Sequence, residues 1–351
     1  SFQQKSGTIA LLSDVSGGLG TSLTSPNDFT GTDTSKIQQA VNYANSNDVA
    51  MIIPKKDAIN TPWDIEEAIL LKSNVTIYID GAILKLTDTS RDNMFRTENC
   101  GLNIFSPYTV LENIHITGIN GATLKGANIP RATGDAGKTL SITTNSGFTL
   151  SFGTDAGIGG ETQIGDWRNN MVMLAYLNNY SITGINFINP HCYSVTQERC
   201  TFGIIRDLLV DAPKSRTITG YGIQYINNNN LLDFRMGCNN IIAQNLRGFS
   251  DDDPLAVILV DVGDTGGNYG EYQVTGNVWG GSIDDIYNIS FQNMFLSTNH
   301  HHLRLLINNS APSAKMYNID VKNLTDTGTT NTGFALLKLG DANPIYGGAN
   351  A

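Results

Sequence analysis

Charged residues are scarce in this sequence. Only 15% of its 351 residues are Asp, Glu, Lys or Arg, whereas glycine is frequent, with 36 residues. A chain rich in Gly, Asn and Thr with so little charge is typical of a turn-rich β protein and not of a disordered one. The charges that are present sum to −10, which argues against nucleic acid or an anionic membrane as a partner.

Long apolar runs and closely spaced cysteines are also missing. The chain has no apolar run of about 18 residues, so it predicts no membrane span. Its four cysteines lie far apart with no CxxC spacing, at Cys100, Cys192, Cys200 and Cys238. We expect buried free thiols, and neither a disulfide framework nor a zinc site nor another cofactor.

Two regions are expected along the chain. Residues 1–33 are rich in Gly, Ser and Thr and contain one apolar patch at 7–15. They predict a linker or lead-in segment to a domain covering 34–351, with the patch outside the repeats of that domain. A chain that starts at Ser1 indicates a processed form or an expressed fragment.

The domain begins with a helix pattern followed by short strand patterns. Residues 33–47 can be capped by Asp33 or Thr34 and place apolar side chains on one face. Strand patterns follow at 51–53, 69–71, 75–79 and 83–86. A helix in front of closely spaced short strands suits a right-handed parallel β-helix, whose open end the helix covers.

A repeated phrase supports this fold class. The order Asn-x-β-x-β recurs at 74–77, 113–116, 179–182, 240–243, 288–291 and 318–321. Short strands that return every few dozen residues after Asn or Gly turns indicate a solenoid. The asparagines at equivalent turns can hydrogen-bond from coil to coil. We therefore expect one all-β solenoid, a single-stranded right-handed parallel β-helix, and no hairpins.

Two insertions interrupt the repeat, near 130–170 and 261–285. Loops of this length are usually functional or disordered. The second carries aromatic residues, including Tyr269 and Trp279. Aromatic rings on such loops suit stacking against sugars, and they suit subunit contacts equally well.

An acidic turn stands between two strand patterns. Asp251, Asp252 and Asp253 are adjacent, and Asn230 and Asp233 lie about one repeat upstream. Adjacent carboxylates repel one another, so the cluster indicates a functional site. A solvated acidic turn is the structural alternative.

With the coils aligned, the chain resembles the polygalacturonase family of glycoside hydrolases over about 35–340. The first matching stretch, 189–200, contains His191 among the residues Asn-Pro-His-Cys-Tyr. In the phrase at 251–257, Asp252 and Asp253 fall on the paired catalytic aspartates. The phrase at 299–303 places His301 on the family's histidine, and the one at 333–338 places Lys338 near its basic residue.

The family pattern is only partly met. Its first aspartate falls on Asn230, with Asp233 three residues further on, and its arginine falls on Ala335. Arg304 could replace that arginine, although it stands about two coils of sequence from the acids. In residues 1–33, the phrase SGTIALLSDV also resembles phage tail-fibre and tailspike proteins.

The resemblance implies an inverting hydrolase that acts on an acidic polysaccharide. Asp252 is the expected general acid, and Asp253 and Asp233 are candidates to activate water. Further side chains are expected to bind the sugar: Asn230, Asp251, His301, Arg304, Lys338, His191, Tyr269 and Trp279.

Other functions remain open on the residues alone. The protein can be a non-catalytic glycan binder, a structural tail component or a polysaccharide lyase, because one scaffold supports all of these. Residues 300–302 also allow a metal site, and the acidic turn allows a Ca²⁺ site, although we expect neither. The resemblance further implies an extracellular protein, as a secreted enzyme or part of a virion tail, with a homotrimer as a candidate assembly.

Overall fold

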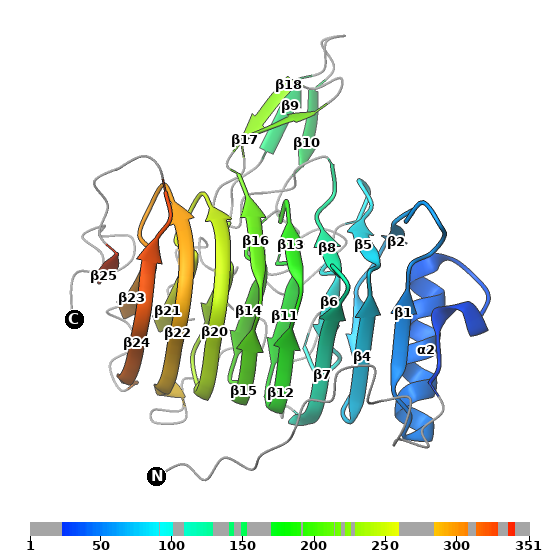
Figure 1. The fold of residues 1–351 in the computed structure, drawn as a ribbon, viewed down its shortest axis with the longest axis horizontal. Coiled ribbons are helices and arrows are strands. Elements are labelled where there is room, and N and C mark those ends of the chain that lie inside the picture. Colours follow the sequence, from blue (N-terminus) through cyan, green and yellow to red (C-terminus); the bar gives the residue numbers. More distant parts are fainter. Residues whose placement is uncertain are drawn as a thin grey trace.

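Parallel strands stacked coil upon coil form the body of the protein (Figure 1). The computed structural model describes residues 23–90, 92–100, 109–128, 140–143, 149–152, 170–190, 192–213, 215–218, 222–225, 229–259, 284–307, 314–328 and 336–340. Each of the first five coils places one strand in each of three columns, and each strand pairs in parallel with its equivalent one coil later. The lead-in patch at 7–15 lies outside the described residues.

The first two columns belong to one thirteen-stranded sheet. The first column contains β1 (Met51–Pro54), β4 (Val75–Asp80), β7 (Leu111–Ile119), β12 (Leu177–Thr183), β15 (Thr201–Arg206), β20 (Asn239–Ser250), β22 (Ile286–Thr298) and β24 (Met316–Asp326). The second contains β2 (Trp63–Ile65), β5 (Ile83–Leu86), β8 (Thr123–Lys125), β13 (Asn186–Ile188) and β16 (Leu209–Ala212). The long strands β20 and β22 run through both columns, which joins them.

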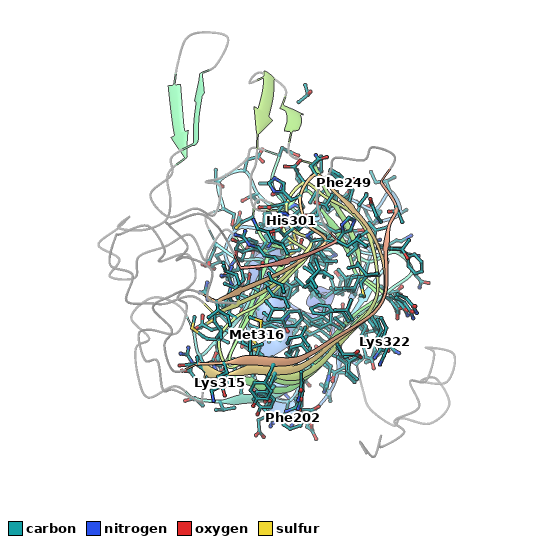
Figure 2. The ribbon with its side chains drawn as sticks, turned by 90° about the vertical axis from the view of Figure 1, so that its left-hand side faces the viewer. Phe202, Phe249, His301, Lys315, Met316 and Lys322 are labelled. Carbon is teal, nitrogen blue, oxygen red and sulfur yellow. The ribbon has the colours of Figure 1, made fainter. Side chains whose placement is uncertain are left out.

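The third column is an eight-stranded sheet. It contains β3 (Ile69–Leu71), β6 (Phe95–Thr97), β11 (Val172–Ala175), β14 (Val195–Glu198), β19 (Leu232–Phe234), β21 (Leu255–Leu259), β23 (Leu303–Ile307) and β25 (Leu337–Leu339). Viewed along the stack, the sheets curl around a continuous core of apolar side chains (Figure 2). Side chains that point outward from the third column are also largely buried, in small apolar clusters separate from the main core. The candidate functional site lies on this column.

The predicted helix α2 (Asp33–Asn47) is confirmed at the start of the stack (Figure 1). Thr32 caps it, and not the predicted Asp33 or Thr34. The buried apolar face of the helix packs on the first coil. Polar side chains of α2 also bond the edge strands: Gln38 exchanges two hydrogen bonds with the backbone of Leu70, and Thr34 accepts from Glu66 N. Through these bonds α2 pairs backbone groups of the edge strands that would otherwise be exposed. The short helix η1 (Pro26–Asp28) precedes α2.

Asparagine ladders join successive coils, as the repeat predicted. Asn113 Nδ2 donates to Asn74 Oδ1 at 2.7 Å, and Asn179 Nδ2 donates to Asn113 Oδ1 at 2.6 Å. The ladder resumes from Asn240 to Asn288 and Asn318. All of these asparagines have φ between 54° and 60°, the left-handed region that Asn tolerates better than most residues. The recurring asparagine therefore serves both backbone conformation and coil-to-coil bonding.

Phe202 occupies the missing rung, between Asn179 and Asn240, with φ 56° and a 56% exposed side chain. On the preceding coil Asn179 Nδ2 donates to Asn113, and on the following coil Asn240 Nδ2 donates to Asn239 instead of to a ladder partner. We expect Phe202→Asn to raise the free energy of unfolding by about 1 kcal/mol, because it relieves the left-handed strain and supplies ladder bonds. Chemical denaturation measures the gain.

The control for that variant is Phe202→Ala, which removes the ring but cannot complete the ladder. Its stability should fall below that of Phe202→Asn. Equal midpoints for the two variants would contradict the role given to the ladder.

Two hairpins correct the expectation that hairpins are absent. Within the first insertion, β9 (Leu140–Thr143) pairs antiparallel with β10 (Thr149–Phe152). Between β16 and β19, β17 (Ser215–Ile218) pairs antiparallel with β18 (Gly222–Tyr225). Both stand beyond one edge of the coil stack (Figure 1), so the parallel columns continue past them. Among the described residues no helix is long and apolar enough to cross a membrane.

Candidate functional site

The acidic turn connects β20 to β21, at the corner between the second and third columns. Asn299, in the equivalent turn one coil later, donates from Nδ2 to Asp251 Oδ1 at 2.6 Å, and His301 N donates to Asp253 Oδ1 at 3.0 Å. These contacts bury Asp251 and Asp253, whereas the Asp252 side chain is 19% exposed. A freely solvated acidic turn is therefore excluded.

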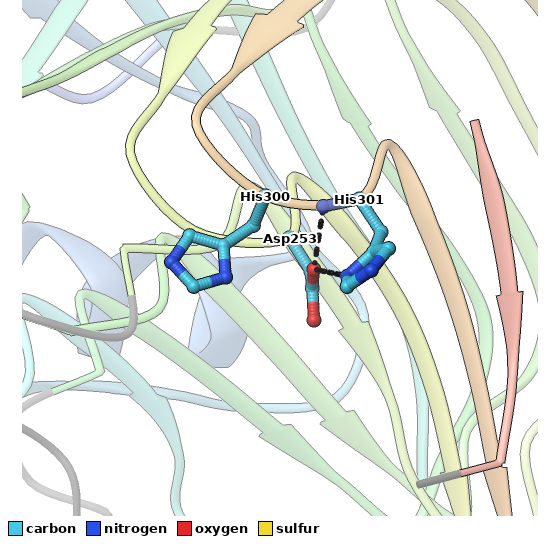
Figure 3. Close-up of side chains that lie close together, drawn as sticks. All are labelled: Asp253, His300 and His301. Carbon is cyan, nitrogen blue, oxygen red and sulfur yellow. Dashed lines mark hydrogen bonds and ion pairs between the residues drawn. The ribbon is translucent and has the colours of Figure 1, made fainter. Parts of the chain in front are cut away.

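Asp253 has two basic partners on the next coil. His301 Nδ1 lies 3.2 Å from Asp253 Oδ1 (Figure 3). Arg304 Nη1 lies 3.3 Å from Asp253 Oδ2. Burial by itself raises the pKa of this carboxyl, but the hydrogen bond from His301 and the charge of Arg304 outweigh it and hold the pKa below the ordinary value. Asp253 is consequently the ionised member of the pair.

Asp252 has the opposite environment. Burial raises its pKa, the neighbouring Asp253 charge raises it further, and His300, whose Nδ1 lies 3.7 Å away, only partly offsets these effects. Two adjacent carboxyls thus have pKa values that move apart. One favours the protonated form and the other the ionised form, which is the division that acid and base catalysis requires.

Asp233 approaches the pair from the preceding coil. It lies on β19, in register with Ala256 on β21, which in turn pairs with Arg304 on β23. Burial raises the pKa of Asp233 to about 7, and the charges of Asp252 and Asp253 contribute to the rise. By this register, Asp233 lies one coil from the strand that follows the acidic turn.

Asp233 has two polar neighbours on its own coil. Asn230 Nδ2 donates to Asp233 Oδ1 at 3.3 Å, and Arg235 Nη2 lies 3.5 Å from the same oxygen. Both contacts lower the pKa of Asp233 but do not overcome its burial. Arg235 also lies over the ring of Tyr193, 5.1 Å from its centroid.

This buried acid makes stability depend on pH. Because the pKa is about 7 in the folded protein and near 3.8 without burial, the folded state retains a proton that the unfolded state releases between these values. Stability should fall as pH rises from about 4 to about 7, and then level off. We expect Asp233→Asn to flatten this slope, which amounts to roughly a few kcal/mol.

Melting temperatures from pH 4 to pH 8 measure the effect of Asp233→Asn. Glu112→Gln, which changes an exposed carboxyl on β7, controls for net charge and should run parallel to the wild type. If the melting temperature of Asp233→Asn also changes with pH in parallel with that of the wild type, the pKa of Asp233 is not raised in the folded protein.

Most of the predicted site residues in the described chain converge here. Asn230, Asp233, the acidic turn, His301 and Arg304 come from three successive coils. Arg304 stands one coil from the acids and not two, because β21 and β23 are direct neighbours. Lys338 pairs with Arg304 one coil further along. Three predicted sugar contacts, His191, Tyr269 and Trp279, lie outside the described residues.

Two residues near the acids were not singled out in the sequence: Asn299 beside Asp251 and Arg235 beside Asp233. His300, considered in the sequence only as a metal ligand, lies beside Asp252. Arg235 follows Asp233 by two positions, a spacing that puts both on one face of an extended segment. That spacing is the feature of the sequence that could have identified Arg235 as a neighbour of Asp233. His300, His301 and Asp253 also form a group that could hold a metal ion.

Comparisons with known proteins support the fold. No protein-family model matches the sequence, and no curated protein does. A mutant tailspike protein of E. coli bacteriophage HK620 aligns with a TM-score of 0.52 and 12% identity, over 97% of this chain and 57% of the tailspike. At this identity the match shows a shared fold alone.

Two exopolygalacturonases are further structural neighbours. The family 28 exopolygalacturonase of Yersinia enterocolitica aligns at 14% identity, over 92% of this chain and 69% of the enzyme, with a TM-score of 0.48. The exopolygalacturonase of Thermotoga maritima aligns at 14% identity, over 93% and 77%, with a TM-score of 0.49. The structural neighbours of this chain are thus polygalacturonases and phage tailspikes, the two groups that the sequence resembles.

Proposed function

We propose that this protein is a right-handed parallel β-helix that hydrolyses an acidic polysaccharide with inversion at the anomeric carbon. The observation that carries the proposal is the opposite direction of the pKa shifts at Asp252 and Asp253. A carboxyl with a raised pKa beside one with a lowered pKa, with basic residues on the next coils, provides the groups that glycoside hydrolysis needs.

The proposed reaction uses the two acids in different roles. Asp252 gives its proton to the glycosidic oxygen as the bond to the anomeric carbon breaks. Asp253 takes a proton from a water molecule, whose oxygen forms the new bond from the opposite face. His301 and Arg304 keep Asp253 ionised for this task. Asp233, with its pKa of about 7, is the second candidate to activate water and becomes ionised only toward neutral pH.

The acidity of the substrate follows from the cationic side chains. Arg304 and Lys338 occupy equivalent positions on adjacent strands, so they form a short basic row beside the acids. A row of this kind binds carboxylate groups of uronic acids or similar sugars. Asn230 and Asp251 are proposed to contact sugar hydroxyls, and His191, Tyr269 and Trp279 to complete the binding surface.

Reducing-end release from a panel of bacterial and plant polysaccharides tests the proposal. We expect activity on an acidic polymer, no rise in absorbance near 235 nm (the region roughly expected for unsaturated lyase products), and a first product with inverted anomeric configuration by NMR. A product that absorbs at that wavelength would establish elimination, and a retained anomer would exclude the inverting mechanism.

A glycan-binding protein without catalysis is the second candidate. It is favoured by Asn230, which stands where the family's first aspartate is expected. Binding of an acidic oligosaccharide without release of reducing ends would support it. In either case we propose an extracellular location, as a secreted protein or the depolymerase part of a phage tailspike, and a homotrimer for the latter.

A further inference from the structure

The turn after β22 brings two histidines to the acidic turn. Residues 299–302 precede β23, so strand alternation does not decide their directions. His300 and His301 both approach Asp253 (Figure 3), whereas the Nε2 of His302 lies 3.2 Å from Leu296 O.

We propose that Asp253, His300 and His301 form a binding site for a divalent transition-metal ion of the zinc type. One ring nitrogen of each histidine and one oxygen of Asp253 lie within 4.8 Å of one another. Ligands around a tetrahedral zinc ion are about 3.4 Å apart, so small side-chain rotations close the set. His300, with a 43% exposed side chain, has room for such a rotation.

The chemistry of the donors selects the metal. Two imidazoles and one carboxylate suit Zn²⁺, Co²⁺, Ni²⁺ or Cu²⁺, whereas Ca²⁺ and Mg²⁺ prefer oxygen ligands throughout. Three protein ligands leave coordination positions open to water or to a substrate oxygen. Asp252 Oδ1, 3.7 Å from His300 Nδ1, is placed to orient that imidazole.

Charge around the site determines how tightly the metal binds. Asp253 is the carboxylate that attracts a cation, but Arg304 lies 3.3 Å from its second oxygen and opposes one. We therefore expect micromolar rather than tighter binding. A metal on Asp253 would occupy the proposed water-activating carboxylate, so zinc acts as an inhibitor. This consequence rests on the proposed function, whereas the binding itself does not.

Calorimetric titration with zinc chloride tests the site, with chelator-treated protein that carries no histidine tag. We expect one ion per chain, at least about tenfold weaker binding in His300→Ala, and a melting temperature that rises with zinc. Co²⁺ bound to the wild type should give visible absorption bands that His300→Ala loses. His115→Ala, on β7 in the first column, is the matched control and should bind as the wild type does.

Three results would overturn the site: no zinc binding, equal binding in His300→Ala, or Ca²⁺ binding as strong as that of zinc. The assays also separate the two proposals. Hydrolysis by a protein that binds no zinc would reject the metal site and keep the hydrolase. Zinc binding by a protein that cleaves no polysaccharide would reject the hydrolase and keep the metal site.

Discussion

Asp252→Asn and Asp253→Asn are each expected to lower turnover on the hydrolysed polysaccharide by about 10²- to 10⁴-fold. An amide at position 252 cannot donate the proton that the leaving oxygen needs, and an amide at position 253 cannot accept one from water. Initial rates of reducing-end release at saturating substrate measure both losses.

The two variants should differ in stability, because the two carboxyls lie in different environments. Asp253 is a buried ion with contacts to His301 and Arg304, so its replacement leaves Arg304 without this partner and should lower the melting temperature at neutral pH. An amide at position 252 resembles the protonated carboxyl that burial already favours, so the melting temperature of Asp252→Asn should stay close to that of the wild type. Full activity in both variants would reject the acid pair.

Asp64→Asn is a suitable control for the acid variants, because it removes an exposed carboxyl on β2 far along the stack. Its rate and melting temperature should match those of the wild type. The pH profile adds a second test. Activity should fall at low pH as Asp253 gains a proton, and at higher pH as Asp252 loses one, since their pKa values are shifted down and up respectively.

Gly248→Ala is expected to reduce the free energy of unfolding by about 2–5 kcal/mol. Gly248 has a φ of 118°, and a Cβ atom there would lie 1.9 Å from the backbone oxygen of Val210 on the neighbouring strand β16. The coils cannot separate locally without breaking their ladder. Because the acidic turn follows three residues later, the variant should also lose activity.

Gly121→Ala is the control that introduces backbone strain without a steric clash. Gly121 has a φ of 84°, but a Cβ atom there meets nothing within 4 Å. Gly121→Ala should lower the free energy of unfolding by about 1–2 kcal/mol, which is the cost of the backbone strain alone. Denaturant midpoints of both variants provide the comparison, and equal losses would contradict a steric role for Gly248.

The fold was predictable because its signal is local and repeated. Each Asn of the repeat stands at a left-handed turn position, and the apolar residues after it enter the core, so one unit read correctly predicts the next. The capping helix α2 was predictable from its apolar face. The β17–β18 hairpin was missed because it interrupts this rhythm, although its three-residue connection contains glycine, a common hairpin signal.

The sequence by itself determined which residue types gather at the acidic turn, since Asp251, Asp252 and Asp253 are adjacent and the family resemblance aligns His301. Only the tertiary structure decided their states. The pKa directions depend on burial and on partners such as Arg304, which is 51 positions from Asp253 in sequence but within hydrogen-bonding distance in the folded chain. Coil stacking turns sequence separations of dozens of residues into neighbouring strands, and electrostatic energies depend on that distance and burial.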